Sequence, residues 1–185
     1  VIAFDTGPGN MILDSLMLKL FNKKFDKGGS ISDRGNVNKK LFEFLSRFDN
    51  FYLKKFPKST GREYYDEGFV NAILNFDRKI AYKDIIATVT KFTAYTIFYN
   101  LKGFEIDELV VSGGGSKNKS LMRYLSEYSV GVNVKTIFEN GITSENKEAV
   151  LFAVLANEIV NGNKTNMPSV TGSDKNVYLG KICIA

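Results

Sequence analysis

The second half of the chain alternates strand-length apolar runs with helix-length segments, and this alternation constrains the fold more than any other feature. An apolar run at 108–111 leads into three glycines, an amphipathic segment at 119–129 and a second run at 130–137. Long helices are expected on either side, at 82–103 and 144–162. Strands that alternate with helices form a parallel or mixed sheet covered by helices. The sequence therefore predicts an α/β fold with a mixed sheet flanked by helices.

The first half combines one expected strand with three expected helices. The apolar run at 1–4 is typical of a buried strand, because turn residues close it directly. Helices are expected at 11–21, 36–53 and 64–74, and a last strand at 176–185. The apolar side chains that share one face at helical spacing are Ile12, Leu13, Leu16, Met17, Leu20 and Phe21 in the first helix, and Val37, Leu41, Phe44, Leu45, Phe48 and Phe51 in the second.

Composition removes several classes of function. The chain has no histidine, which excludes Ser-His-Asp and Cys-His catalysis and leaves acid–base chemistry to Asp, Glu, Lys or Tyr. Cys183 is the only cysteine; we expect it to be a small buried hydrophobe in a reducing compartment, the cytoplasm. The net charge of +5 comes from scattered lysines without a basic stripe, so no nucleic-acid partner is expected. No apolar run reaches the roughly 20 residues of a membrane span, so no membrane partner is expected either.

The stretch AFDTGPGN, at 3–10, places a carboxylate and two glycines in one tight turn between an expected strand and an expected helix. In open α/β sheets, ligands bind beyond the carboxyl ends of strands, where such turns lie. Asp5 would there act as a general base or hold a magnesium-bound water, while glycine lets backbone N–H groups approach phosphate oxygens. The plainer alternative is that Asp5 caps the turn and that Gly7 and Gly9 only permit it.

Three consecutive glycines, Gly113–Gly115, follow the apolar run at 108–111. Ordering such a run costs much backbone entropy, so we expect a ligand to lie against this backbone, and a nucleotide is the obvious candidate. The alternative is a flexible loop. Because two strand–glycine loop–helix units occur in one chain, we expect both loops to open on the same edge of the sheet.

Two further polar stretches lie at expected helix starts. In KSTGRE, Thr60 begins a capping box, or else Lys58 and Arg62 form an anion or carboxylate site at a helix N-terminus; both interpretations stay open. In SENKEAVLFA, Glu148 lies one turn into a helix that Ser144 can cap, where the helix dipole favours a carboxylate. If this helix end faces a cleft, Glu148 would instead accept hydrogen bonds from sugar hydroxyls.

Five stretches, taken together in their order and spacing, resemble a single family. They are FDTGPGNMILD, PKSTGRE, VSGGGSKN, GITSENKEAVLFAVLA and NMPSVTG. They resemble anhydro-N-acetylmuramic acid kinase, a member of the actin-like ATPase and sugar-kinase superfamily. The resemblance implies an enzyme that hydrolyses the 1,6-anhydro ring of this amino sugar and phosphorylates the freed 6-oxygen with ATP and Mg²⁺. The product would be N-acetylmuramic acid 6-phosphate, used in peptidoglycan recycling.

The resemblance also implies roles for single residues. Asp5 would be the general base that activates water for attack on the anomeric carbon, and Glu148 would hold the sugar. No protein ligand to a metal is expected, and KSTGRE and PSVTG receive no chemical role. The residues implied for the nucleotide are Thr6, Gly7, Gly9 and Asn10 in a second phosphate loop, and Gly113, Gly114, Gly115 and Asn118 in the adenosine site.

The chain also departs from the family pattern. Members are about twice as long and begin with a lobe that carries a GTSxDG-type loop, which this chain lacks, as it lacks the NxGGxAN-type strand before the first motif. We therefore expect 1–185 to be a single domain, the C-terminal ribonuclease H-like or actin-like ATPase lobe of a two-lobe kinase. Without the N-terminal lobe it is expected to be inactive, and the complete protein a homodimer. The alternatives are a non-catalytic nucleotide- or sugar-binding fragment and another sugar or acetate kinase.

Overall fold

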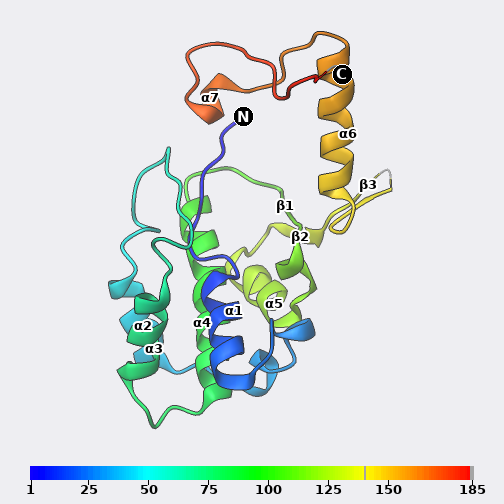
Figure 1. Ribbon diagram of the computed structural model, residues 1–185. Coiled ribbons are helices and arrows are strands. Elements are labelled where there is room, and N and C mark those ends of the chain that lie inside the picture. The colour runs from blue at the N-terminus through cyan, green and yellow to red at the C-terminus, as the bar shows by residue number, and fades with distance from the viewer. Residues whose placement is uncertain (140, 184–185) are drawn as a thin grey trace. The chain divides into compact units, whose positions relative to one another are not determined.

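A computed structural model describes residues 1–139 and 141–183 of the chain. They divide into two compact units (Figure 1). The larger unit is Asp5–Thr136, and the smaller unit joins Val1–Phe4 to the residues from Ile137 onward. The larger unit contains α1 (Met11–Phe21), η1 (Lys27–Gly29), η2 (Ser32–Arg34), α2 (Lys39–Phe48), α3 (Glu67–Phe76), α4 (Tyr82–Leu101), β1 (Glu108–Val111), η3 (Gly114–Lys117), α5 (Lys119–Tyr128) and β2 (Asn133–Thr136).

Helix α4 is the central element of the larger unit and packs against α1, α2 and α5 (Figure 1). Several threonine side chains of α4 are buried with its apolar ones. Their hydroxyls can be buried because they donate hydrogen bonds to backbone carbonyls of the same helix. Thr90 Oγ1 donates to Ile86 O at 2.8 Å, and Thr96 Oγ1 to Thr93 O at 2.9 Å. Among the described residues, α4 is the longest helix, and no helix there is long and apolar enough to cross a membrane.

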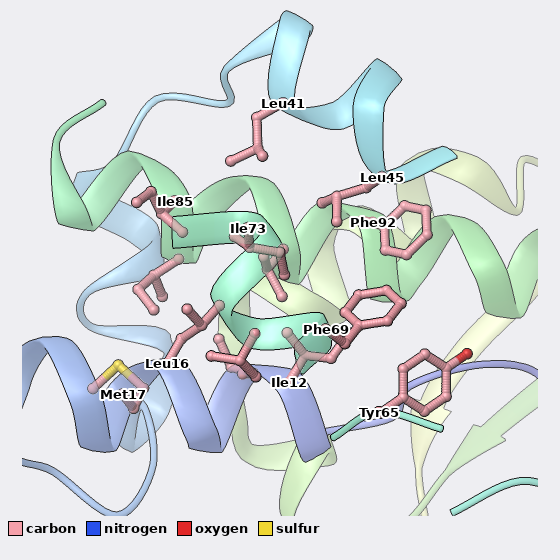
Figure 2. Close-up of a cluster of buried hydrophobic side chains, with 14 of the residues drawn as sticks. Ile12, Leu16, Met17, Leu41, Leu45, Tyr65, Phe69, Ile73, Ile85 and Phe92 are labelled. Carbon is pink, nitrogen blue, oxygen red and sulfur yellow. The ribbon is translucent and has the colours of Figure 1, made fainter. Parts of the chain in front are cut away.

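The main core lies between α1, α2, α3 and α4, and Figure 2 shows their apolar side chains converging. The predicted inner face of α1 is confirmed, because Ile12, Leu13, Leu16 and Met17 are all buried. Aromatic rings add edge-to-face contacts, in which the Phe92 ring lies 5.9 Å from that of Tyr52. The other labelled side chains of this core are Leu41, Leu45, Tyr65, Phe69, Ile73 and Ile85.

A strand–helix–strand unit completes the larger unit. Strands β1 and β2 pair in parallel, with Leu109 opposite Val134, and α5 connects them. Leu121 and Leu125 of α5 are buried in a second small core, against which both strands pack. The predicted mixed α/β architecture is confirmed, although the sheet that the structure describes here is a parallel pair rather than a larger mixed sheet.

The smaller unit contains the antiparallel pair β3 (Phe138–Glu139) and β4 (Ile142–Thr143), followed by α6 (Lys147–Val160) and α7 (Pro168–Thr171). Asn146 fixes the entry to α6, because its Oδ1 accepts a hydrogen bond from Thr143 N at 2.7 Å. None of the α6 residues is buried, and Phe152 and Val160 are 68% and 74% exposed. The PSVTG stretch forms α7, which ends at Gly172 with a φ of 70°.

Two predicted strands are wrong in the described residues. Neither 1–4 nor 176–183 forms a strand, and residues 184–185 of the second prediction lie outside the described residues. A strand needs a neighbour that pairs with its N–H and C=O groups, and neither segment pairs with a strand in the part that the structure describes. Val1 and Ile2 are exposed, and so is Cys183, so the prediction of a buried cysteine is also wrong.

Helix boundaries differ from the sequence prediction where a good capping residue lies inside or beyond the periodic segment. Helix α2 begins after Asn38, whose Oδ1 accepts a hydrogen bond from Leu41 N at 3.0 Å. Helix α3 begins after Asp66, whose Oδ1 accepts one from Phe69 N at 2.9 Å. Such caps pair backbone donors that have no partner within the helix, and they decide where the helix starts.

Candidate functional site

Asp5 lies where an extended segment turns towards α1, and its partners come from a distant part of the chain. Its Oδ2 accepts hydrogen bonds from Ser59 Oγ at 3.0 Å and from the Thr60 backbone N–H at 2.8 Å. The Asp5 N–H donates to the Lys58 carbonyl at 3.1 Å. Since both carboxylate bonds fall on Oδ2, Oδ1 receives no hydrogen bond from the described residues. The Asp5 side chain is therefore held in place through one oxygen, and the other accepts no hydrogen bond in the part of the chain that the structure describes.

A second set of polar contacts fixes the segment that holds Asp5. Lys58 Nζ donates to Asn100 Oδ1 at 2.5 Å and to the Tyr52 carbonyl at 2.9 Å. Asn100 Nδ2 donates to the Thr6 carbonyl at 3.0 Å and to the Thr96 carbonyl at 2.8 Å. Burial lowers the pKa of Lys58. The Lys58 ammonium thus connects the loop before α3 to α4, and Asn100 of α4 connects both to the Asp5 turn.

Both sequence interpretations of KSTGRE are wrong, because no helix begins there. Residues 62–64 form a turn and 65–66 a bend, and Asp66 caps α3, so Thr60 begins no capping box. Arg62 and Lys58 flank no helix N-terminus, which rules out the anion site in the form we expected. The stretch instead supplies the two donors to Asp5, which sequence reasoning missed.

The first glycine loop packs directly on α4. A Cβ atom added to Gly7 would lie 2.6 Å from Thr96 Oγ1, so only glycine allows this approach. Gly9 has a φ of 51°, and its carbonyl accepts a hydrogen bond from Thr93 Oγ1 at 3.3 Å. Thr93, Thr96 and Asn100 are spaced by three and four residues, which places them on one face of α4. That polar spacing within an apolar helix is the signal that could have identified these three residues.

The second glycine loop joins β1 to α5 and lies next to the first. A Cβ on Gly115 would lie 3.4 Å from Asn10 Oδ1, and one on Gly114 would lie 3.8 Å from Asn10 Nδ2. Gly113 has a φ of 82° and a ψ of −174°, a conformation that is essentially restricted to glycine. A Cβ there would meet no atom within 4 Å among the described residues. The structure thus brings the two loops together, but not at the common sheet edge that the sequence predicts, because the segment before the first loop forms no strand.

The two asparagines of these loops are used differently. Asn118 is buried and caps α5, because its Oδ1 accepts a hydrogen bond from Leu121 N at 3.1 Å. Asn10 occupies the N-cap position of α1 but makes no capping bond with its side chain. The Asn10 amide faces Gly115 instead, so it is the one of the pair that is placed between the loops.

Glu148 lies in the smaller unit, in the first turn of α6, and is exposed. Its position near a helix N-terminus agrees with the favourable effect of the helix dipole on a carboxylate. The predicted cap is wrong, since Asn146 rather than Ser144 occupies the N-cap position. Within residues 1–139 and 141–183, no group of three or more acidic or cysteine side chains is placed to hold a metal ion.

Comparison with known proteins identifies the family. The family model described as anhydro-N-acetylmuramic acid kinase matches residues 1–185. The chain belongs to the anhydro-N-acetylmuramic acid kinase family. The family confirms the resemblance carried by the five sequence stretches, and it is a family of kinases, which are phosphotransferases.

Curated relatives from several bacteria carry the same name. The chain is 42% identical to the anhydro-N-acetylmuramic acid kinase of Clostridioides difficile (strain 630) over 188 residues, covering 98% of this chain and 49% of the relative. It is 42% identical to that of Bacillus cereus (strain Q1), with 98% and 49% covered. It is 40% identical to that of Caldanaerobacter subterraneus subsp. tengcongensis, with 100% and 48% covered. The chain therefore spans about half the length of the curated relatives it matches.

Proposed function

We propose that this chain supplies part of an ATP-dependent kinase that hydrolyses the 1,6-anhydro ring of anhydro-N-acetylmuramic acid and phosphorylates the 6-oxygen. Membership of the family supports this proposal. The observation that carries it is the placement of Asp5, whose carboxylate is held through Oδ2 by Ser59 and Thr60 while Oδ1 stays uncommitted among the described residues. A general base needs this combination of a fixed position and an open oxygen.

In the proposed reaction, Asp5 accepts a proton from a water molecule that attacks the anomeric carbon. The new bond joins the water oxygen to that carbon, and the bond from that carbon to the 6-oxygen breaks, which relieves the strain of the bicyclic sugar. The 6-oxygen then attacks the γ-phosphorus of ATP, and ADP leaves. The proton on Asp5 passes to solvent. Such a sequence depends mainly on alignment and on neutralisation of phosphate charge, which Mg²⁺ would supply.

The alternative that Asp5 only caps its own turn is less consistent with its contacts. Both hydrogen bonds that the described residues give to the carboxylate come from Ser59 and Thr60, 54 and 55 residues away in sequence. A turn-capping aspartate accepts from backbone groups within a few residues of itself. The long-range partners therefore favour a carboxylate whose orientation matters for a ligand.

The two glycine loops are the proposed nucleotide site. A Cβ on Gly113 would meet no atom within 4 Å among the described residues, and we propose that an adenosine lies against this backbone, whose N–H groups suit an anion at close range. Asn10, whose amide lies near Gly114 and Gly115, is proposed to contact a phosphate. The structure suggests supporting roles for others: Gly7 packs on α4 and Asn118 caps α5. The residues for which nucleotide contact stays a prediction are Thr6, Gly7, Gly9, Asn10, Gly113, Gly114, Gly115 and Asn118.

Several finer points also stay predictions. Glu148 is proposed to hold the sugar, and Mg²⁺ is proposed to reach the site with ATP, since this ion is commonly held by one or two carboxylates and by substrate phosphates. Four further points remain predictions: that 1–185 is a single actin-like lobe, that this lobe is the C-terminal half of the kinase, that the complete kinase is a homodimer, and that it is cytoplasmic.

The proposal is tested by the sugar that the kinase accepts. The full-length kinase, by which we mean the polypeptide of full family length that contains this chain, is assayed for ADP release with anhydro-N-acetylmuramic acid and with N-acetylmuramic acid. We expect turnover with the anhydro sugar alone. Comparable turnover with the ring-opened sugar would indicate another sugar kinase of the superfamily, and ATP binding without turnover on either sugar would indicate a non-catalytic module.

The role of Asp5 is tested by Asp5→Asn in the same full-length kinase. Asparagine keeps the size of the side chain and an acceptor oxygen but cannot take up the proton, so turnover should be lost while ATP binding stays within about twofold. Asp33→Asn is the matched control, because Asp33 is an exposed aspartate in η2. Turnover of Asp5→Asn that approaches the rate of the control would exclude the general-base role.

A further inference from the structure

We infer that the segment Lys58–Thr60 is the positioning element of Asp5: it fixes the carboxylate through Oδ2 and thereby selects Oδ1 as the oxygen that accepts the proton. This inference deepens the proposed function and rests on it. It also gives KSTGRE, a charged stretch whose two predicted roles the structure overturns, a role in the same site.

The direct contacts come first. Ser59 Oγ and Thr60 N both donate to Oδ2, at 3.0 and 2.8 Å, and hydrogen bonds to an ionised carboxylate are stronger than neutral ones. Two donors on one oxygen oppose rotation of the carboxylate, which would otherwise exchange its two oxygens. Among the described residues, Oδ1 is the oxygen that receives no hydrogen bond.

The backbone contact fixes the distance between the two segments. The Asp5 N–H donates to the Lys58 carbonyl at 3.1 Å, one residue before the two carboxylate donors. The main chain of Asp5 and its side chain are thus held by three consecutive residues. Hydrogen bonds to both the backbone and the carboxylate of Asp5 restrict its position to the precision of about 0.5 Å that catalysis requires.

The segment is itself anchored to α4, which makes it a rigid support. Lys58 Nζ donates to Asn100 Oδ1, and Asn100 Nδ2 donates to the Thr6 carbonyl, directly after Asp5. Lys58 Nζ also donates to the Tyr52 carbonyl at 2.9 Å and lies 5.2 Å from the centre of the Phe51 ring. The Asp5 turn and its support therefore share one attachment, Asn100.

The test compares two changes at Ser59 in the full-length kinase. Ser59→Ala removes one donor to Oδ2 and is expected to lower kcat about tenfold, with KM for ATP and sugar within about twofold. Ser59→Thr keeps the hydroxyl and is expected to restore most of the rate. Ser126→Ala, which removes an exposed hydroxyl of α5 that donates to Met122 O at 3.1 Å, is the control and should leave the rate unchanged.

The two failures can be told apart. Wild-type kcat in Ser59→Ala beside an inactive Asp5→Asn would overturn this inference alone, and so would a Ser59→Thr variant as slow as Ser59→Ala. Wild-type turnover in Asp5→Asn would overturn the proposed base role, and this inference with it.

Amide hydrogen exchange tests the geometry without activity, in the chain itself. The Thr60 N–H should exchange at least tenfold faster in Asp5→Ala, which removes its acceptor, than in Asp5→Asn, which keeps one. The Tyr64 N–H, which bonds to the Gly61 carbonyl at 3.2 Å in the following turn, reports any general loosening. Equal exchange of the Thr60 N–H in both variants would overturn the proposed contact.

Discussion

Gly7→Ala tests the close contact between the Asp5 turn and α4. The added Cβ would lie 2.6 Å from Thr96 Oγ1 and 2.9 Å from Thr96 Cβ, both closer than Cβ atoms normally come to other atoms. Thr96 cannot easily move aside, because it is fully buried and its hydroxyl donates to the Thr93 carbonyl. Overpacking of this kind costs about 1–3 kcal/mol, and we expect the free energy of unfolding to fall by that amount.

A second substitution identifies the clash as the cause. Thr96→Ala removes Oγ1, the closest atom, but leaves the Thr96 Cβ at 2.9 Å, so it should relieve Gly7→Ala only in part. We expect a coupling free energy of about 1 kcal/mol between the two changes. Gly9→Ala is the matched control: its φ of 51° makes alanine cost about 1–2 kcal/mol, yet its Cβ would meet nothing within 4 Å. The costs of Gly9→Ala and Thr96→Ala should therefore add.

The assay is urea unfolding of the purified chain and its variants, monitored by circular dichroism. The free energies of unfolding are compared with a common value for their dependence on urea concentration. A Gly7→Ala variant that loses less than about 0.5 kcal/mol would refute the clash, since that is the scatter expected for a neutral surface change. Strict additivity of Gly7→Ala with Thr96→Ala would refute it as well. Coupling between Gly9→Ala and Thr96→Ala would show that the double-mutant comparison measures something other than the contact between residue 7 and Thr96.

Two further predictions concern the second glycine loop and a buried carboxylate. Gly114→Ala should weaken ATP binding by the full-length kinase while lowering stability little, because its Cβ would meet only Asn10 Nδ2, at an ordinary contact distance of 3.8 Å. Gly113→Ala should instead cost about 1–3 kcal/mol of stability through the φ and ψ of Gly113, which only glycine adopts readily. Unchanged ATP affinity in Gly114→Ala, measured by calorimetry, would count against the nucleotide site. Burial raises the pKa of Asp49 above its usual 3.8, against opposing hydrogen bonds from the Phe51 N–H and the Tyr65 hydroxyl, so its protonated form favours folding. The protonated Asp49 carboxyl therefore adds to the free energy of unfolding below pH 3.8, and this contribution is lost as pH rises through the folded-state pKa. In urea unfolding at a series of pH values, Asp49→Asn should remove this decline in the free energy of unfolding. An unchanged decline would show that Asp49 is not its source.

Local patterns predicted the parts of the fold that depend on local interactions. Helical spacing predicted the buried face of α1, and an apolar run, a glycine loop and an amphipathic segment predicted β1, α5 and β2. Strands at 1–4 and 176–183 could not be decided in this way, because a strand exists only with a neighbour that the local sequence does not reveal. The start of α3 moved from residue 64 to Glu67 because the cap of Asp66 outweighs the apolar periodicity before it.

The same distinction applies to the candidate site. Asp5 and the two glycine loops stand out in the sequence, and the loops do lie together, although the rule that predicted it assumed a strand at 1–4 that the structure does not contain. The partners of the Asp5 carboxylate do not stand out, because Ser59 and Thr60 lie 54 and 55 residues away in the sequence. Their side chains become meaningful only once the fold brings the segments together.

The central claim is that Asp5 activates the water that opens the anhydro ring. The most direct measurement follows oxygen from isotopically labelled water into the product of the full-length kinase, in samples quenched before the free sugar exchanges its anomeric oxygen. The account predicts one labelled oxygen on the anomeric carbon, none in the phosphate group, and neither labelled sugar nor ADP from Asp5→Asn. Label in the phosphate group, or labelled sugar formed by Asp5→Asn at the wild-type rate, would contradict it.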